Sequence, residues 1–271
     1  MNWKGCLPVS KVALIIGASS GIGEAVAHEL LKQNYIVYNG SRSRAHNEQI
    51  INITVDVVND EAIRRALRIV WEAEHRIDVF IYSAGFSMST PLEYVDFSDV
   101  YYLYQVNLFG LMVFMKYLIP LFKIQGGGRI IGIGSMGSII PIPYDSYYSS
   151  AKAALNLFLQ TQAIELKRFK IFITSVLPGG VRTNFTFKRK EYWIDTQKYP
   201  DFNDAGYVLG DLEQKGMSPI KVARKIVNIL NRKKPPIILP IGLKNRLLYS
   251  LAIIVPPRWL NNIVYKKYRL K

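Results

Sequence analysis

The sequence predicts an α/β fold, a doubly wound parallel sheet with helices on both faces. Seven short apolar runs alternate with segments long enough to form crossover helices, an alternation typical of parallel sheets. No stretch rich in proline, glycine or serine divides the 271 residues, so we expect a single domain over residues 1–271. The expected strands are residues 11–16, 35–40, 51–55, 77–82, 129–134, 171–177 and 236–241.

The first expected strand leads into a glycine-rich turn. K11-V-A-L-I-I16 is apolar throughout, as in a strand buried on both faces. G17-A-S-S-G21-I-G23 follows, and Ile22, Val26 and Leu30 then recur at four-residue, helical steps. Glycines at such a turn let the backbone bend and let a pyrophosphate approach the N–H groups at the helix N-terminus. Because the spacing is not the common G-x-G-x-x-G, a plain structural turn is the alternative for this segment alone.

A second group of polar residues follows the fifth expected strand. Tyr148 and Lys152 stand four residues apart in Y148-S-S-A-K152, which places them on one helix face, and Ser135 lies thirteen residues before Tyr148. Hydride transfer to a carbonyl requires a proton at its oxygen, and a free tyrosine, with a pKa of about 10, releases its proton too reluctantly near neutral pH. We expect the charge of Lys152, with that of an oxidised nicotinamide, to lower the Tyr148 pKa, and Ser135 to donate to the substrate oxygen.

Two neighbours compete for these roles. Tyr147 is adjacent to Tyr148, but only Tyr148 has a lysine four residues later. Ser138 is the rival hydroxyl, three residues closer to Tyr148 than Ser135 is. The spacing therefore favours Ser135 and Tyr148.

In this order and at these distances, the motifs resemble the short-chain dehydrogenase/reductase family, in its compact single-domain branch with a Rossmann fold. The resemblance covers roughly residues 10–240. Two positions depart from the family pattern and bear on cofactor affinity more than on activity: Ile16 replaces a threonine, and Y82-S-A-G85 replaces Asn-Asn-Ala-Gly. The matching segments are G17-A-S-S-G-I-G23, D56-V57, S83-A-G85, Asn107, Ser135, Y148-x-x-x-K152 and Pro178-Gly-Gly-Val-Arg-Thr183.

The resemblance implies four catalytic residues, Ser135, Tyr148, Lys152 and Asn107. Lys152 would also hold the nicotinamide ribose hydroxyls, and Asn107 would link Lys152 to solvent through water. On its own, an asparagine in a helical stretch is more often structural.

The resemblance also implies a dinucleotide site in which Asp56 contacts adenine and Thr183 holds the carboxamide side of the nicotinamide. The expected cofactor-binding residues are Gly17, Ser19, Ser20, Gly21, Ile22, Gly23, Ser41, Arg42, Asp56, Val57, Ser83, Ala84, Gly85, Tyr148, Lys152, Pro178, Gly179, Val181 and Thr183. No metal is expected.

The end of the second strand indicates which dinucleotide binds. Relatives that use NAD carry an acid at the position of Ser41, which grips the ribose 2′-hydroxyl and would repel a 2′-phosphate. Here Ser41 is followed by Arg42, whose guanidinium suits a phosphate. We therefore expect NADP(H), with a solvated loop arginine as the alternative reading of Arg42.

The substrate pocket is expected between residues 137–144 and a lid over residues 184–217. The run from Gly134 to Tyr148 looks like the hydroxysteroid and retinoid branch of the family more than the sugar-reducing branch, so we expect a hydrophobic ketone or alcohol, such as a steroid or long-chain lipid. A packed lid is the alternative explanation for these apolar loops. The expected lining is Ile139, Ile140, Pro141, Pro143, Tyr144, Phe185, Phe187, Tyr192 and Trp193.

The net charge of +15 comes almost wholly from the C-terminal part of the chain. Residues 214–271 hold fourteen Lys/Arg and no Asp/Glu, whereas residues 1–213 hold 21 basic and 20 acidic residues. Within a basic and apolar extension over residues 243–271, the apolar run 247–255 has aromatic and cationic flanks, which favours contact with an anionic membrane surface. A helix packed on the protein's own body or on a partner subunit is the alternative. No nucleic acid is expected, because no recognition motif accompanies the charge.

The remaining features bound the class of protein. The lone Cys6 gives no disulfide framework and fits a reducing compartment, and residues 1–8 lack a signal-peptide core. No stretch reaches the roughly 18 apolar residues of a spanning helix, so we expect a cytoplasmic homo-oligomer, dimer or tetramer, peripheral to a membrane at most.

Two alternatives stay open: a non-catalytic NADP(H)-binding or scaffold protein, and a reductase of small or acyl-carrier-linked ketones. The complete Ser135–Tyr148–Lys152 set favours an enzyme.

Overall fold

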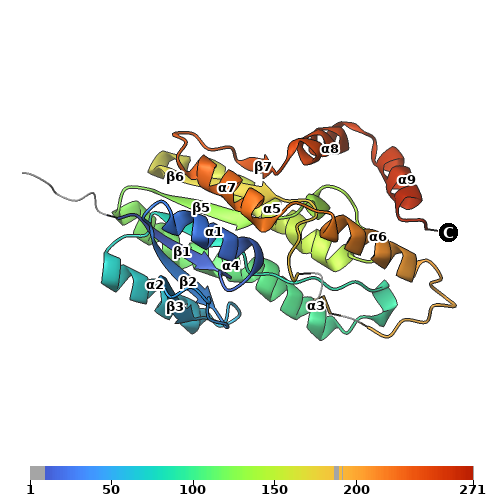
Figure 1. Ribbon diagram of the computed structural model, residues 1–271, viewed down its shortest axis with the longest axis horizontal. Coiled ribbons are helices and arrows are strands. Elements are labelled where there is room, and N and C mark those ends of the chain that lie inside the picture. Colours follow the sequence, from blue (N-terminus) through green and yellow to red (C-terminus); the bar gives the residue numbers. More distant parts are fainter. Residues whose placement is uncertain (1–9, 186–188, 191, 271) are drawn as a thin grey trace, which may run out of the picture.

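The computed structural model describes residues 10–185, 189–190 and 192–270. Seven parallel strands form one sheet in the order β3-β2-β1-β4-β5-β6-β7, with helices on both faces (Figure 1). The predicted fold class is confirmed. The first and last residues of every strand lie within two residues of the expected bounds. Cys6 and Phe187 lie outside the described residues. The strands are β1 (Val12–Ile16), β2 (Ile36–Ser41), β3 (Ile50–Thr54), β4 (Val79–Tyr82), β5 (Gly128–Ile133), β6 (Ile171–Leu177) and β7 (Ile238–Pro240).

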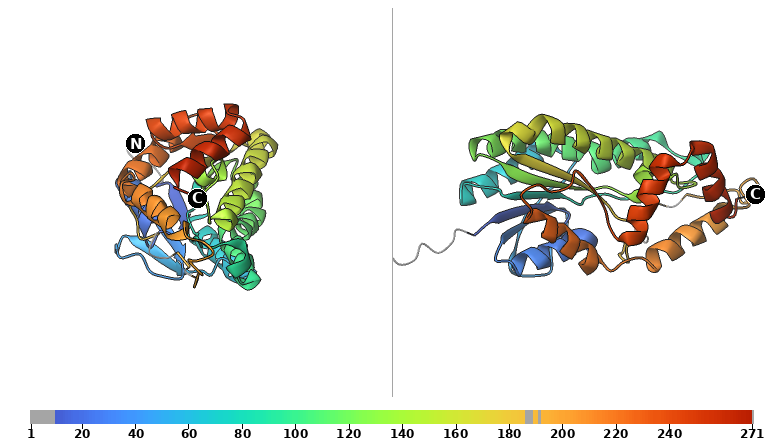
Figure 2. Two further views of the ribbon diagram at one scale, coloured as in Figure 1. Left: turned by 90° about the vertical axis from the view of Figure 1, so that its right-hand side faces the viewer. Right: turned by 90° about the horizontal axis from the view of Figure 1, so that it is seen from above.

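The helices divide between the two faces of the sheet (Figure 2). Helices α2, α4 and α5 cover one face, and α1 and α7 cover the other. The helices are α1 (Gly21–Leu31), α2 (Asp60–Glu74), α3 (Phe97–Tyr104), α4 (Gly110–Ile124), α5 (Ser146–Leu166), α6 (Phe202–Gln214), α7 (Pro219–Leu230), α8 (Leu243–Ile254) and α9 (Pro257–Lys267).

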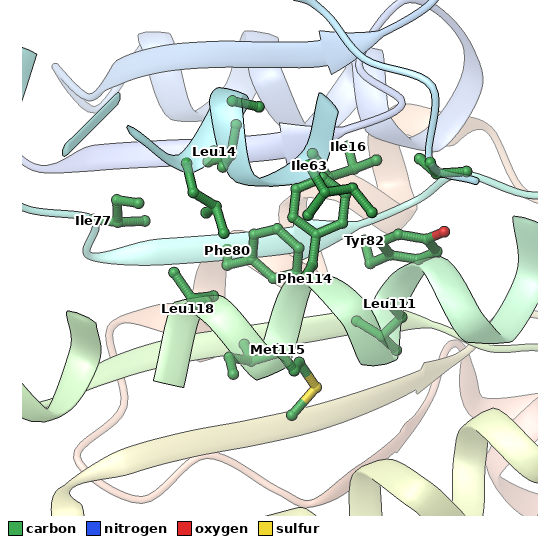
Figure 3. Packing of buried hydrophobic residues seen from close by; sticks show 14 of the residues in the cluster. Leu14, Ile16, Ile63, Ile77, Phe80, Tyr82, Leu111, Phe114, Met115 and Leu118 are labelled. Carbon is green, nitrogen blue, oxygen red and sulfur yellow. The ribbon is translucent and has the colours of Figure 1, made fainter. Parts of the chain in front are cut away.

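Each buried strand supplies both cores, because successive side chains of a strand point to opposite faces. Phe80 and Tyr82 of β4 join the core under α2 and α4, whereas Val79 and Ile81 join the core under α1 and α7. Phe80 and Phe114 of α4 pack with ring centroids 5.3 Å apart (Figure 3). The apolar runs of the sequence are therefore continuous because both faces of the sheet are covered.

The strand order creates a crevice at one edge of the sheet. From β1 the chain moves outward to β2 and β3, then returns to β4 on the other side of β1. Loops that leave the carboxyl ends of β1 and β4 therefore diverge, and open α/β sheets bind their ligands at such a switch point.

One long helix corrects an expectation from the sequence. Helix α3, a π-helical turn and α4 follow one another without a break over Phe97–Ile124. Judged only by its length and composition, this helical segment could cross a membrane, although no such segment was expected. Half of its apolar window is buried inside the protein, where Phe114, Leu118 and Phe122 pack on the sheet. A π-helical turn at Gln105–Phe109 interrupts it, and π-turns often mark functional positions.

The C-terminal extension forms two helices, α8 and α9, beyond the end of the sheet that also carries α6 (Figures 1 and 2). Val264 and Tyr268, within and just after α9, are buried against Ala205 and Leu209 of α6. No residue of α8 is buried. Helix α9 therefore packs on α6, which lies within the segment 184–217 that was expected to form the lid.

Candidate active site

A large cavity, about 1150 Å³, lies where the strands end at their carboxyl side. Its walls come from the segments that follow β1, β2, β3, β4, β5 and β6, together with α5, α6 and α8. Every residue predicted to bind the cofactor lines this cavity except Gly23. Of the predicted catalytic residues, Ser135, Tyr148 and Lys152 line it and Asn107 does not. The fold thus gathers motifs that are far apart in the sequence.

The glycine turn after β1 is a cradle that side chains would fill. Gly17 has a φ of +93° and Gly21 a φ of +65°, the left-handed region that favours glycine. A Cβ on Gly17 would lie 3.0 Å from the backbone nitrogen of Ala84. A Cβ on Gly23 would lie 2.2 Å from the carbonyl oxygen of Gly17, so Gly23 serves the close packing of α1 on the turn rather than the cavity wall. Open backbone at the start of α1 fits a pyrophosphate.

Asn39 fixes the position of the glycine turn, a role that the sequence analysis did not predict. It is buried in β2, and its Oδ1 accepts a hydrogen bond of 3.0 Å from the backbone N–H of Ala18. Its Nδ2 donates to the Ser43 carbonyl at 3.2 Å and to Asn52 Oδ1 at 2.9 Å. One side chain therefore ties the glycine turn to the loop after β2. The sequence feature that could have pointed to Asn39 is a single amide side chain within the apolar run Y35-I-V-Y-N-G40.

The loop after β2 places Arg42 at the cavity wall. Its guanidinium donates a hydrogen bond of 2.9 Å to the Tyr102 hydroxyl, and both side chains line the cavity. The Ser41 hydroxyl donates to the Ser43 carbonyl. Asp56, after β3, accepts from the backbone N–H of Val58 at 3.2 Å. This part of the cavity wall therefore presents the Ser41 hydroxyl and, next to it, the Arg42 guanidinium.

Tyr148, Lys152 and Ser135 all line the crevice. Tyr148 and Lys152 project from the first two turns of α5, and both are more than nine-tenths buried. Lys152 Nζ donates to the Ile133 carbonyl at 3.0 Å and lies 5.7 Å from the centroid of the Tyr148 ring. Ser135 Oγ accepts from the Gly137 N–H at 3.0 Å, which fixes the hydroxyl at the end of β5.

The rival hydroxyls lie elsewhere. Neither Tyr147 nor Ser138 lines the cavity. Ser138 Oγ donates to the Ser135 carbonyl at 2.6 Å, so it braces the turn that carries Ser135. The Tyr147 ring packs against Phe97 in an edge-on contact. The spacing argument therefore selected the two hydroxyls that reach the cavity.

The expectation for the Tyr148 pKa is wrong as far as the protein's own groups are concerned. Burial raises the pKa of the Tyr148 hydroxyl and the nearby Asp145 raises it further, while a hydrogen bond with Ser135 acts in the opposite direction. Burial also lowers the pKa of Lys152 to about 8, because a desolvated ammonium is less stable. The part of the expectation that invokes an oxidised nicotinamide stays a prediction.

Asn107 lies behind the cavity in the π-turn. It is fully buried, and its Nδ2 donates to the carbonyls of Phe86 and Leu103 at 2.9 and 3.0 Å. Its Oδ1 accepts no hydrogen bond from any residue that the structure describes. A Cβ on Gly85 would lie 2.6 Å from that Oδ1 and 3.3 Å from Lys152 Nζ, so the bare Gly85 lets the two polar groups share one space.

The substrate half of the cavity is mostly apolar, and only part of its lining was predicted. Ile140 and Phe185 line it as expected, whereas Trp193 is 81% exposed and Tyr144 packs instead against Phe202 of α6. Ile139, Pro141, Pro143 and Tyr192 are also absent from its walls. The missed residues come from α6 and the C-terminal extension: Leu209, Leu212, Leu243, Asn245, Leu248 and Tyr268.

A carboxyl group is buried in that apolar half. Asp145 precedes α5 and lines the cavity, and its Oδ1 has no hydrogen-bond partner among the described residues. Burial raises the pKa of Asp145 to about 8; the positive charge of Arg189 opposes the shift and the negative charge of Glu213 adds to it. Asp145 is therefore largely protonated near neutral pH.

The crevice, the glycine cradle and the paired tyrosine and lysine define the class of protein. The short chain dehydrogenase family profile matches residues 11–192, and the chain belongs to the short-chain dehydrogenase/reductase family. It is an oxidoreductase of that family.

The individual relatives are consistent with this class. The chain is 32% identical to the 3-ketodihydrosphingosine reductase of Bacteroides thetaiotaomicron, over 86% of this chain and 88% of that protein. It is 28% identical to retinol dehydrogenase 8 of Bos taurus, over 84% and 80% of the two chains. Among solved structures, ElxO with NADP bound superposes with a TM-score of 0.72 at 26% identity, over 86% of this chain and 97% of that one.

Proposed function

We propose that this protein is an NADP(H)-dependent oxidoreductase that interconverts a ketone and a secondary alcohol on a hydrophobic, lipid- or steroid-like substrate. The observation that carries the proposal is the shared cavity, because Ser135, Tyr148, Lys152 and the glycine turn all line it. The proposed proton donor Tyr148, the Ser135 hydroxyl that would hold the carbonyl oxygen, and the glycine turn that would bind the dinucleotide therefore open onto the same cavity.

The cofactor is NADP(H). When bound, it supplies or accepts the hydride. The cradle of Gly17 and Gly21 would hold the pyrophosphate, and Arg42 would bind the 2′-phosphate, since no acid stands at Ser41 to repel it. The relative of known structure that carries NADP supports this choice.

The chain's own residues would move one proton. The Tyr148 hydroxyl would donate to the carbonyl oxygen, whose second hydrogen bond would come from Ser135. Lys152, next to both Tyr148 and the cavity, would stabilise the tyrosinate that remains. The unpartnered Oδ1 of Asn107 would accept from a water that reaches Lys152 and returns the proton.

The hydrophobic substrate is inferred from the cavity wall and from the relatives. Ile140, Ile142, Phe185, Leu209 and Leu212 line the same cavity as Tyr148, and the Phe185 and Tyr148 rings pack with centroids 5.7 Å apart. The two curated relatives described above are named for a long-chain lipid ketone and for retinol, both apolar. A flat apolar or long-chain molecule would bury the most surface there.

The test is a turnover screen of steroids, retinoids and long-chain acyl ketones with NADPH. Tyr148→Phe should abolish turnover and leave NADPH affinity nearly unchanged, since only the hydroxyl is removed. Lys152→Met should damage both, because it removes a ribose contact as well as the ammonium.

Tyr147→Phe is the matched control, because it removes a neighbouring hydroxyl that lies outside the cavity. Wild-type turnover by Tyr148→Phe would overturn the assignment. NADPH binding without turnover on the whole panel would instead favour a non-catalytic binding protein.

A further inference from the structure

A stripe of apolar side chains runs along the outer face of α8. Leu243, Leu247, Leu251 and Ile254 follow at steps of four, four and three residues, which places them on one side of the helix. They are 84%, 62%, 46% and 78% exposed. Large apolar side chains gathered in one exposed stripe, rather than scattered, mark a contact surface.

The other face of α8 belongs to the active-site cavity. Asn245 and Leu248 line the cavity, and the Asn245 amide would lie 2.7 Å from a Cβ on Gly179 in the loop after β6. Asn245 is fixed by a hydrogen bond of 2.7 Å from its Nδ2 to the Ile241 carbonyl. Leu243, at the start of α8, borders the cavity as well, whereas Leu247, Leu251 and Ile254 do not line it.

Helix α9 repeats this two-sided arrangement. Trp259 and Ile263, one turn apart, are 68% and 58% exposed, while Val264 and Tyr268 are buried against α6. Amphipathic aromatic residues of this kind are common at the membrane–water boundary.

The charge of this region identifies the surface that it fits. No acidic residue occurs after Glu213, and Arg246, Arg258 and Lys266 are exposed on or beside the two helices. Apolar side chains flanked by cations match a bilayer whose headgroups are anionic. A second copy of the chain would bring an equally cationic segment to the contact, and nucleic acid would leave the leucines unburied.

We propose that α8 and α9 dock on an anionic membrane through a lipid face made of Leu243, Leu247, Leu251, Ile254, Trp259 and Ile263. Docking brings the mouth of the cavity, formed in part by α8, to the bilayer surface, so that an apolar substrate passes from lipid into the cavity. The passage of substrate rests on the proposed function. The docking itself does not.

The test is co-sedimentation of the full-length protein with phosphatidylcholine vesicles, with and without phosphatidylserine. Wild type should sediment with the anionic vesicles, and Leu247→Glu with Leu251→Glu should lower partitioning at least tenfold. Arg246→Ala with Lys266→Ala should weaken it about fivefold for each residue removed. None of these four side chains lines the cavity.

Each change has a matched control on another part of the surface. Leu92→Glu alters a leucine that is 66% exposed outside the extension, and Lys116→Ala with Lys123→Ala removes two exposed charges from α4. Both should sediment like wild type. Retained NADPH binding shows that each variant is folded.

Three outcomes would overturn the docking. The wild-type protein could stay in the supernatant at low salt, or the α8 variants could lose no more vesicle binding than their controls. The third is a molecular mass, measured by light scattering, that falls in the leucine variant while its vesicle binding persists. The last would mean that a second copy covers the stripe. Vesicle binding by a wild type that turns over no ketone would refute the proposed function and leave the docking intact. Turnover of a detergent-dispersed steroid, retinoid or long-chain ketone without vesicle binding would refute the docking and leave the proposed function intact.

Discussion

At the scale of single residues, Arg42 decides between two cofactors that differ by one phosphate. Arg42→Ala should weaken NADPH binding by about 1.5–3 kcal/mol, the range for a hydrogen bond to a charged group, and should barely change NADH binding. Titration of both dinucleotides by fluorescence or calorimetry measures the two losses.

Arg44→Ala is the control for Arg42, because Arg44 is exposed two residues later and does not line the cavity. It should leave both affinities unchanged. Equal losses of NADPH and NADH binding in Arg42→Ala would show that Arg42 does not read the 2′-phosphate.

Asp145 makes the stability of the protein depend on pH. Its folded pKa of about 8 lies above the unfolded value of 3.8, so between these values the native state holds a proton that the unfolded state has lost. This contribution to the unfolding free energy is therefore complete below pH 3.8 and is lost as pH rises towards 8, with a slope approaching about 1.4 kcal/mol per pH unit.

Asp145→Asn keeps the size of the side chain and removes its titration. Thermal unfolding from pH 5 to pH 8 should show a smaller decline in Tm for Asp145→Asn than for wild type. The half-buried carboxyl of Asp204 on α6 provides the comparison, and Asp204→Asn should follow the wild-type profile. Parallel profiles for all three proteins would contradict the buried titration.

At the scale of elements, glycine marks where a helix touches the sheet. A Cβ on Gly110, at the start of α4, would lie 2.4 Å from the Tyr82 hydroxyl and 2.8 Å from the Val57 carbonyl. Gly110→Ala should therefore destabilise the protein by about 1–3 kcal/mol, as overpacked cores do. Urea unfolding measures the change.

Gly206→Ala in α6 is the opposite case, because nothing lies within 4 Å of the added methyl group. Alanine is favoured over glycine in a helix by about 1 kcal/mol, so this variant should be as stable as wild type or more so. A stabilising Gly110→Ala would show that α4 can move away from β4 at little cost.

At the scale of the whole molecule, the excess of basic residues and the predicted catalytic residues lie in different parts of the chain. Residues 1–213 are close to neutral and hold Ser135, Tyr148 and Lys152, while the excess of basic residues follows Glu213 and includes Lys244, which lines the cavity from α8. The proposed lipid face is thus next to the active site and shares only Leu243 with the lining of the cavity. The homo-oligomer, the cytoplasmic location and the absence of a nucleic-acid partner stay predictions.

The local order of residues determined the strands, the glycine turn and the spacing of Ser135, Tyr148 and Lys152. These features follow from periodicity and turn chemistry, which act over a few residues. The sequence likewise distinguished Tyr148 from Tyr147, because one helical turn fixes which side chain faces the same way as Lys152.

Only the tertiary structure decided the properties that depend on which distant segments meet. It buried Lys152 and Tyr148 and so reversed the expected direction of the Tyr148 pKa, and it placed Asn39 between two loops of the cofactor site. It also brought α8 to the cavity wall and kept Leu247, Leu251 and Ile254 of the leucine stripe outside the cavity. Burial and long-range contact are properties of the packed chain, and no local pattern of residues encodes them.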